Sequence, residues 1–177
     1  MPVLAIGLIA AGNQLTAANM SLYGGNEGLV NLTSGDNNVA VGDQSLADTT
    51  TGSQNTAIGE MSLKSNTTGA GNTALGRFSL YSNTTGGDNV AVGVGALTAN
   101  IEGSQNTAIG SAAGSNNVTG TGNVFIGYMA GSQTSGSNML VIDNSSTNTP
   151  LIYGDFAQDS VTVNGTLNVT GGLNVAT

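Results

Sequence analysis

Residues 52–59 read GSQNTAIG, and this short stretch defines a pattern that covers most of the chain. The motif Asn-[Thr/Val]-[Ala/Phe]-[Ile/Val/Leu]-Gly recurs at one constant interval, starting at Asn38, Asn55, Asn72, Asn89, Asn106 and Asn123. The closing glycines keep the same spacing, at Gly42, Gly59, Gly76, Gly93, Gly110 and Gly127. Six units therefore fill residues 35–136 without an insertion or a deletion. A fixed period of this kind indicates a repeat architecture.

Each unit contains a short stretch that is typical of a β-strand. Successive side chains of a strand point to opposite faces, so Ile58 and Ala57 are expected on opposite faces. A second segment, Ser62-Leu63 in the second unit, is expected to form another short strand, and the Thr-Thr-Gly that follows is turn chemistry. The high content of Gly and Asn disfavours a helix. One unit is therefore a narrow coil with two short strands.

Stacking of identical coils at the spacing of paired strands predicts an all-β fold, a parallel β-solenoid (β-roll or β-helix) of six 17-residue coils. We expect the Ile/Val/Leu position and the Leu position to form internal columns. Stacked Asn side chains are expected to form a hydrogen-bonded ladder from Asn38 to Asn123. The repeated glycines are expected at the corners of the coils.

A stripe of alanines lies opposite the predicted internal Ile column, at Ala40, Ala57, Ala74, Ala91 and Ala108. Small side chains permit close approach, and a narrow core gains stability from self-association. We therefore expect these alanines to contact other copies in an intertwined homotrimer. The alternative is that they fill a tight corner of each coil.

The two ends depart from the repeat. Residues 1–34 do not show the motif, and we expect an N-terminal docking and capping segment with a degenerate half-coil. Its start, Met1 to Ala11, is apolar but too short to span a bilayer, and it lacks the basic region of an ordinary signal peptide; a noncanonical signal is the alternative. Residues 137–177 alternate apolar and polar side chains, which predicts a C-terminal stalk of short β-strands.

Composition excludes several classes of function. The net charge is −8, and Lys64 and Arg77 are the only basic residues, so we expect no nucleic-acid partner and no membrane insertion. There is no His and no Cys, which removes the commonest general base, transition-metal ligand and thiolate nucleophile. We expect no enzymatic activity, no catalytic residue, no metal site and no cofactor.

The repeats resemble the heads of trimeric autotransporter adhesins and, more closely, the related repeats of bacteriophage tail fibres. Residues 52–59 and 79–86 carry the resemblance within the repeats, and residues 142–146, 150–156 and 164–171 resemble the link that follows them in fibre proteins. The resemblance covers about residues 35–172. It implies a homotrimeric, left-handed β-roll or β-helix used for attachment. Family members often continue into an intramolecular chaperone domain that is later cut off. We expect that such a domain has been removed here, that another protein assists folding, or that this is a short spike, and the lack of an autotransporter anchor favours a virion protein.

The resemblance therefore implies a structural fibre or spike subunit of a virion, which mediates or supports attachment to a host cell surface. Expected partners are the chain itself, other virion or baseplate proteins through the N-terminal segment, and a host surface glycan. The alternative is a bacterial surface adhesin or an extracellular filament subunit. A monomeric ice-binding solenoid is a third class, suggested by the threonine columns 50-67-84 and 51-68-85, although both columns are interrupted.

Candidate receptor contacts are the aromatic side chains Phe78, Tyr81 and Tyr128, with packing between subunits as the alternative. The acids Asp36, Asp43, Glu60, Asp88 and Glu102 lie in or next to turns and share no common coil position, which indicates solvated loop charges rather than the carboxylate pair of a glycosidase. They form no calcium-binding repeat, although a single ion on a threefold axis stays open. Glycosylation sequons at Asn66, Asn83 and Asn117 are expected by chance in this composition.

Overall fold

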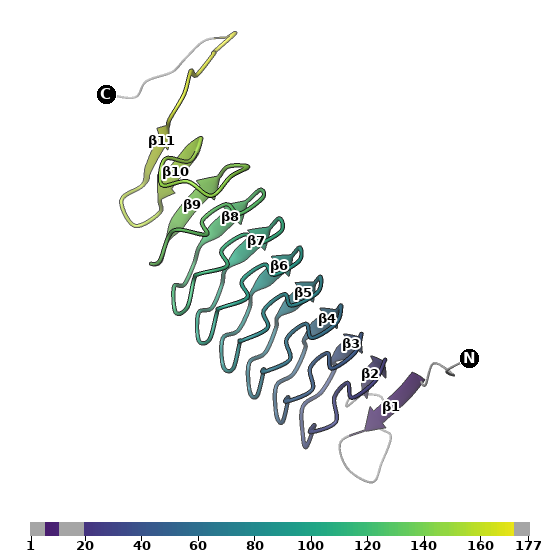
Figure 1. The fold of residues 1–177 in the computed structure, drawn as a ribbon. Helices are drawn as coiled ribbons and strands as arrows, with labels where there is room; N and C mark the ends of the chain where they lie inside the picture. The colour runs from purple at the N-terminus through teal and green to yellow at the C-terminus, as the bar shows by residue number, and fades with distance from the viewer. Residues whose placement is uncertain (1–5, 11–19, 172–177) are drawn as a thin grey trace, which may run out of the picture.

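The computed structural model describes residues 6–10 and 20–171. Over these residues the fold is all-β, and eleven strands form one sheet whose strand order follows the sequence. The strands stack one above the next along a solenoid with about six turns and a spacing of about 17 residues. Figure 1 shows the resulting rod, with the strands aligned along one side and the turns along the other. The predicted parallel β-solenoid is confirmed.

Six three-residue strands are the motif positions of the six repeats. They are β3 (Val39–Val41), β4 (Thr56–Ile58), β5 (Thr73–Leu75), β6 (Val90–Val92), β7 (Thr107–Ile109) and β8 (Val124–Ile126). Each pairs in parallel with the next at an offset of exactly one repeat unit, as Ala57 does with Ala74. The sequence period is therefore the register of the sheet.

The parallel sheet extends beyond the six motifs at both ends. β2 (Met20–Gly24) pairs in parallel with β3, and the offset between Leu22 and Val39 is again one full repeat. Residues 20–34 are therefore in register, contrary to our expectation of a degenerate half-coil. At the other end, β9 (Met139–Ile142) pairs in parallel with β8 at a slightly shorter offset, which places Leu140 opposite Val124.

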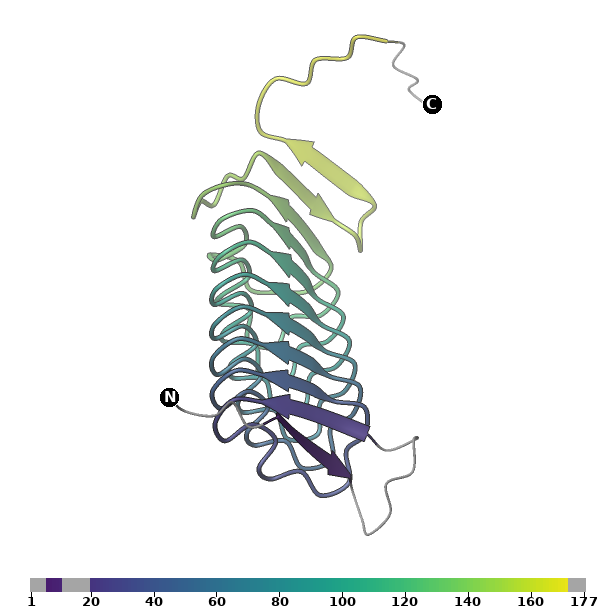
Figure 2. The same cartoon turned by 90° about the vertical axis from the view of Figure 1, so that its right-hand side faces the viewer.

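Antiparallel strands flank the parallel stack. β1 (Ile6–Ala10) pairs with β2, and the predicted docking role of Met1 to Ala11 falls largely outside the described residues. β10 (Ile152–Asp155) pairs with β9, and β11 (Ser160–Val163) pairs with β10. Figure 2 shows the C-terminal hairpin beyond the last coil, where it continues the sheet. Antiparallel pairs of this kind cover the ends of a solenoid that would otherwise expose unpaired parallel strands.

The predicted orientation of the motif strands is wrong. We expected the Ile/Val/Leu position inside the coil and the alanine outside, and the structure has the reverse. Alanine is fully buried at its position in five coils, namely Ala40, Ala57, Ala74, Ala91 and Ala108. The neighbouring aliphatic position is on the outside, where Ile58 is 39% exposed and Ile109 is 43% exposed. The interior of most coils holds a leucine from the opposite wall, such as Leu63 or Leu80, packed in the same core as the alanines. Because the coil is narrow, a leucine facing an alanine fills it. The alanines are therefore not outward-facing trimer contacts.

The predicted second strand of each coil is also wrong. Residues 60–65 form turns, and Leu63 has a φ of 50°. Equivalent leucines in other coils have the same left-handed conformation, for example Leu46 and Leu97 with a φ of 51°. This conformation is incompatible with a strand. The segment still bonds to the next coil, because the Leu63 N–H donates to the Ser79 carbonyl at 3.0 Å.

Two ladders of buried asparagines run through the solenoid. In the predicted ladder, Oδ1 of Asn55 accepts from both the main-chain N–H and the side-chain amide of Asn72, at 3.0 and 3.1 Å. A second ladder, at positions where the sequence predicts turns, is formed by Asn66, Asn83, Asn100 and Asn117. All members of both ladders are at most 1% exposed. Both ladders satisfy polar groups at the corners, where main-chain turns leave donors and acceptors unpaired.

The closing glycines occupy corners that exclude every other residue. Gly59, for example, has a φ of 133°, and a Cβ there would lie 2.6 Å from the carbonyl carbon of Gly76 in the next coil. The column thus combines a backbone conformation that L-residues avoid with a contact too close for a side chain.

One large side chain breaks the alanine column, and small residues compensate for it. Phe125 replaces alanine in β8 and is fully buried. The opposite wall has Gly114 and Gly131 where earlier coils have leucine. A Cβ on either glycine would lie 2.5 or 2.2 Å from the Phe125 ring. The core volume is therefore conserved by an exchange between the two columns.

Candidate functional site

The outward face of the sheet carries two continuous columns of side chains. One contains Val41, Ile58, Leu75, Val92, Ile109 and Ile126, which are paired in register from strand to strand. The other contains Val39, Thr56, Thr73, Val90, Thr107 and Val124. We call the first column the aliphatic stripe. Its members in β3, β4, β5, β7 and β8 are between 37% and 45% exposed.

The aliphatic stripe continues where the regular repeat has ended. Ile126 pairs with Ile142 of β9, Ile142 pairs with Ile152 of β10, and Ile152 pairs with Val163 of β11. Paired residues lie on the same face of a sheet, so the stripe crosses nine strands. At about 4.8 Å per strand it is roughly 38 Å long.

This continuation shows that duplication of the 17-residue unit does not by itself account for the aliphatic stripe. Within the repeats, an aliphatic residue could simply have been copied with its unit. β9, β10 and β11 are not copies of the unit, and two of their pairings are antiparallel. An aliphatic residue is nevertheless retained on the same line of the sheet. Monomeric soluble proteins seldom expose a contiguous apolar surface of this length.

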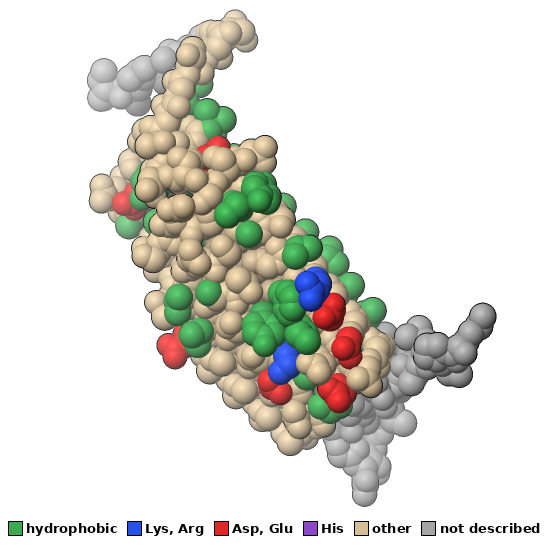
Figure 3. Space-filling model, in the orientation of Figure 1, with side chains coloured by type: hydrophobic (Ala, Val, Ile, Leu, Met, Phe, Trp, Pro, Cys, Tyr) green, Lys and Arg blue, Asp and Glu red, His purple; other side chains and the backbone are tan. Residues whose placement is uncertain are grey.

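A second surface feature is an aromatic cluster on the turn that follows β5. The rings of Phe78 and Tyr81 meet edge to face, with centroids 5.5 Å apart and an interplanar angle of 84°. The guanidinium carbon of Arg77 lies 4.1 Å from the centroid of the Phe78 ring. Figure 3 shows this apolar patch between the two basic side chains, with acidic side chains beside them.

Two ion pairs between successive coils border the aromatic cluster. Arg77 Nε lies 2.9 Å from a carboxylate oxygen of Glu60, and Lys64 Nζ lies 3.4 Å from a carboxylate oxygen of Asp48. All four side chains remain between 26% and 54% exposed. Exposed pairs of this kind contribute little to stability, about 0–1 kcal/mol.

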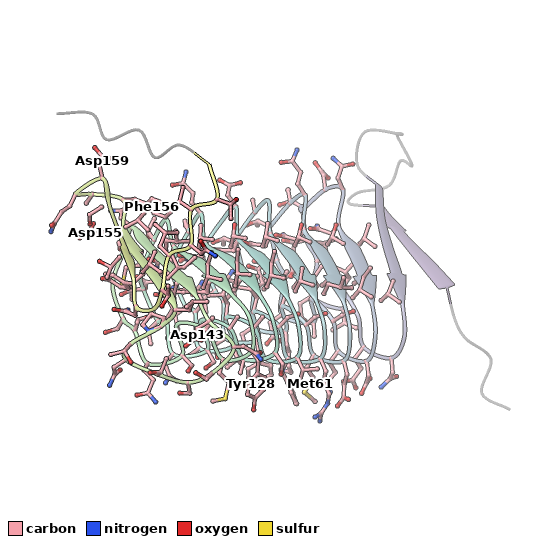
Figure 4. All side chains as sticks on the ribbon, turned by 90° about the horizontal axis from the view of Figure 1, so that it is seen from above. Met61, Tyr128, Asp143, Asp155, Phe156 and Asp159 are labelled. Carbon is pink, nitrogen blue, oxygen red and sulfur yellow. The ribbon has the colours of Figure 1, made fainter. Side chains whose placement is uncertain are left out.

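The predicted receptor residues do not form one group. Phe78 and Tyr81 are in contact, and both are partly buried. Tyr128 is 53% exposed and occupies the coil position of Arg77, but three coils further along. Three coils correspond to about 14 Å. Figure 4 shows Tyr128 and Met61 projecting from the same side of the solenoid.

The remaining sequence candidates are dispersed. Asp36, Asp43, Glu60, Asp88 and Glu102 lie in loops and turns that are spread over three of the six repeats. Among the described residues there is no group of three or more acidic, His or Cys side chains that could hold a metal ion. No helix long and apolar enough to cross a membrane is found within 6–10 and 20–171.

The glycosylation sequons and one of the threonine columns form hydrogen bonds within the solenoid. The sequon residues Asn66, Asn83 and Asn117 are fully buried in the second asparagine ladder. The threonine column 50-67-84 bonds to the next coil, because the Thr50 hydroxyl donates to the Thr67 carbonyl at 3.1 Å and Thr67 repeats the contact with Thr84 at 3.0 Å. Neither set presents its polar groups freely at the surface.

The fold and its outer face define the chain as a parallel β-solenoid with an exposed apolar sheet face. No family model matches the chain, and no curated protein or solved structure is significantly similar to it.

Proposed function

We propose that this protein is a structural subunit of a homotrimeric virion fibre or spike, in which the aliphatic stripes of three copies pack around a common axis. The assembly mediates or supports attachment to a host cell surface and performs no catalysis. A bacterial surface adhesin would use the same assembly. The observation that carries the proposal is the aliphatic stripe, which remains continuous where the repeat stops.

The energetics favour burial of this face. Covering the remaining surface of each exposed Ile, Leu or Val side chain contributes roughly 1–2 kcal/mol. The interior of a single coil is small, with an alanine opposite a leucine in most coils. Association through the sheet face adds a second apolar core, which a thin solenoid otherwise lacks. A parallel arrangement around an axis brings equivalent residues of the three copies together along the whole stripe.

Light scattering of the purified chain tests this assembly. One chain has a mass of 17.4 kDa, and we expect a species with three times that mass. The double variant Ile58→Asp with Ile109→Asp places two charges in each stripe, and we expect a folded monomer by circular dichroism. Val94→Asp is the matched control, because Val94 is 54% exposed but lies outside the sheet. A wild-type monomer, or equal dissociation of both variants, would contradict the proposal.

Ice binding is the second candidate, and the outer face itself favours it. Thr56, Thr73 and Thr107 share the column beside the aliphatic stripe with Val39, Val90 and Val124, so the sheet presents a row of Thr and Val next to a row of aliphatic residues. A monomer with this face open to water would support this candidate if it depressed the freezing point below the melting point. A trimer without such thermal hysteresis would exclude it.

A further inference from the structure

The aromatic cluster consists of residue types that most of the other coils lack at the equivalent positions. The chain has two basic residues and seven aromatic residues in 177, yet both basic residues and two aromatics lie within residues 64–81. Other coils have Gly95, Ala112 or Met129 at the position of Phe78, and Thr98 or Ser115 at that of Tyr81. The backbone is the same in these coils, with a φ of 58° at Phe78, 56° at Ala112 and 55° at Met129. The fold therefore does not require these side chains.

The cluster is arranged as a fixed apolar surface. The edge-to-face contact with Tyr81 and the guanidinium above the ring hold Phe78 in place from two directions. Phe78, Tyr81 and Met61, which lies one coil before Phe78, are all partly exposed. Within the described part of the chain, the Tyr81 hydroxyl makes no hydrogen bond, so it is available to a ligand.

Polar groups with both donor and acceptor character border this surface. The Arg77 guanidinium and the Glu60 carboxylate orient each other at 2.9 Å, and each retains unused hydrogen-bonding capacity because about half of each side chain is exposed. Lys64 and Asp48 repeat the arrangement. A sugar ring has an apolar face of C–H groups and a rim of hydroxyls that both donate and accept. An aromatic surface bordered by oriented donors and acceptors fits that chemistry.

The charges indicate a neutral sugar. Each cation already has a carboxylate partner, so no unpaired positive charge is available for a carboxylate or phosphate on the ligand. Asp43 and Glu27 lie on the preceding coils at the positions of Arg77 and Phe78, respectively, and add negative charge along the same side. This field repels anionic ligands.

We infer that the surface formed by Met61, Phe78 and Tyr81, bordered by the two ion pairs, is a binding site for a neutral glycan. The inference rests on the proposed attachment function and names its ligand class. Tyr128 lies outside the site.

Binding of the full chain to an array of neutral glucans, mannans and galactans, with sialylated and uronic-acid glycans beside them, tests the inference. We expect binding to at least one neutral glycan, and a loss of roughly tenfold or more in affinity for Phe78→Ala and Tyr81→Ala. Tyr128→Ala is the matched control, since it removes an exposed aromatic side chain from the same side of the rod, and it should bind like the wild type. Absence of binding to every neutral glycan, preference for acidic glycans, or equal loss in the control would overturn the inference.

Light scattering of the same variants separates this inference from the proposed function. If Phe78→Ala keeps the mass of three chains and loses glycan binding, both stand. If it keeps the mass and still binds, the site is wrong and the assembly stands. If the mass falls to one chain, the ring pair is a subunit contact and the glycan site is overturned.

Discussion

Individual residues determine the corners of this solenoid, and the glycines show it most clearly. Each closing glycine combines a positive φ, 135° at Gly42 and Gly93, with a carbonyl group of the next coil where a Cβ would lie. The sequence predicts these corner positions, because a backbone geometry that only glycine tolerates requires a glycine at the same position of every repeat. The first asparagine ladder was predicted for the same reason.

The second asparagine ladder was missed for a physical reason. Asn66 and Asn83 each precede a Thr-Thr-Gly stretch that is typical of an exposed turn. Burial of the Asn83 amide depends on two partners, the Gly86 carbonyl three residues further along and Asn66 in the preceding coil. No single repeat contains that information.

Gly93→Ala should be far more disruptive than Gly95→Ala. At Gly93 the φ is 135°, and a Cβ would lie 2.5 Å from the main chain of Gly110, so we expect a loss of about 3 kcal/mol or more in unfolding free energy. At Gly95 nothing lies within 4 Å, and other coils have Ala or Met with a similar φ, so a cost of about 1 kcal/mol is expected. Urea unfolding followed by circular dichroism compares the two; equal losses would refute this account of the corner.

Thr49→Asn should stabilise the fold. Thr49 lies one coil before Asn66, is fully buried, and its hydroxyl has no hydrogen-bond partner. An asparagine there can accept from the Asn66 amide and donate to the Gly52 carbonyl, as Asn66 does to Gly69 at 3.0 Å. We expect a gain of about 1 kcal/mol. Thermal unfolding measures it, with the exposed Thr51→Asn as the control, and a loss of stability at Thr49 would contradict the ladder.

At the scale of elements, the single strand of each coil was predicted and its orientation was not. Both faces of the sequence Thr-Ala-Ile are compatible with burial, and alternation alone does not say which face is internal. The larger side chain was expected inside. The structure places it outside, because the leucine from the opposite wall already occupies the narrow interior.

The leucine segment looked like a strand because it carries an apolar residue at a regular position. Its left-handed conformation, with a φ of 50° or 51° in Leu46, Leu63, Leu80 and Leu97, turns the chain sharply instead. Non-glycine residues adopt this conformation rarely, and no sequence rule anticipates it for leucine. The stacked coils impose it at every level of the rod.

The replacement of alanine by Phe125 in one core column, and of leucine by Gly114 and Gly131 in the other, allows a test of core packing. Phe125→Ala should cost about 3–5 kcal/mol, because the opposing Gly114 and Gly131 leave a cavity. The triple variant Phe125→Ala, Gly114→Leu, Gly131→Leu restores the arrangement of the earlier coils and should recover most of that loss. Chemical unfolding measures both, with Gly114→Leu alone as the control, which should destabilise because the Phe125 ring occupies its space. Absence of rescue would refute the exchange.

At the scale of the whole molecule, the sequence period predicted the number of central coils, and the ends were less predictable. The coil of residues 20–34 retains the path of the repeat while losing its motif, so only the pairing of β2 with β3 reveals it. The continuation of the aliphatic stripe through β9, β10 and β11 was also not visible in the sequence, because it depends on antiparallel pairings. These relationships join residues at varying spacing, which a periodic search cannot find.

Association of copies through the outer face of the sheet is the central claim, and cysteine cross-linking tests it most directly. The chain has no cysteine, so a single substitution reports on one position without background. Around a threefold axis, Ile109→Cys brings equivalent thiols together, and a disulfide requires Cα atoms about 4.4–6.8 Å apart. Mild oxidation should give a covalent dimer on a non-reducing gel, with one chain of each trimer left unlinked. Val94→Cys, exposed but outside the sheet, should remain monomeric on the same gel; cross-linking at Val94 and none at Ile109 would contradict the account.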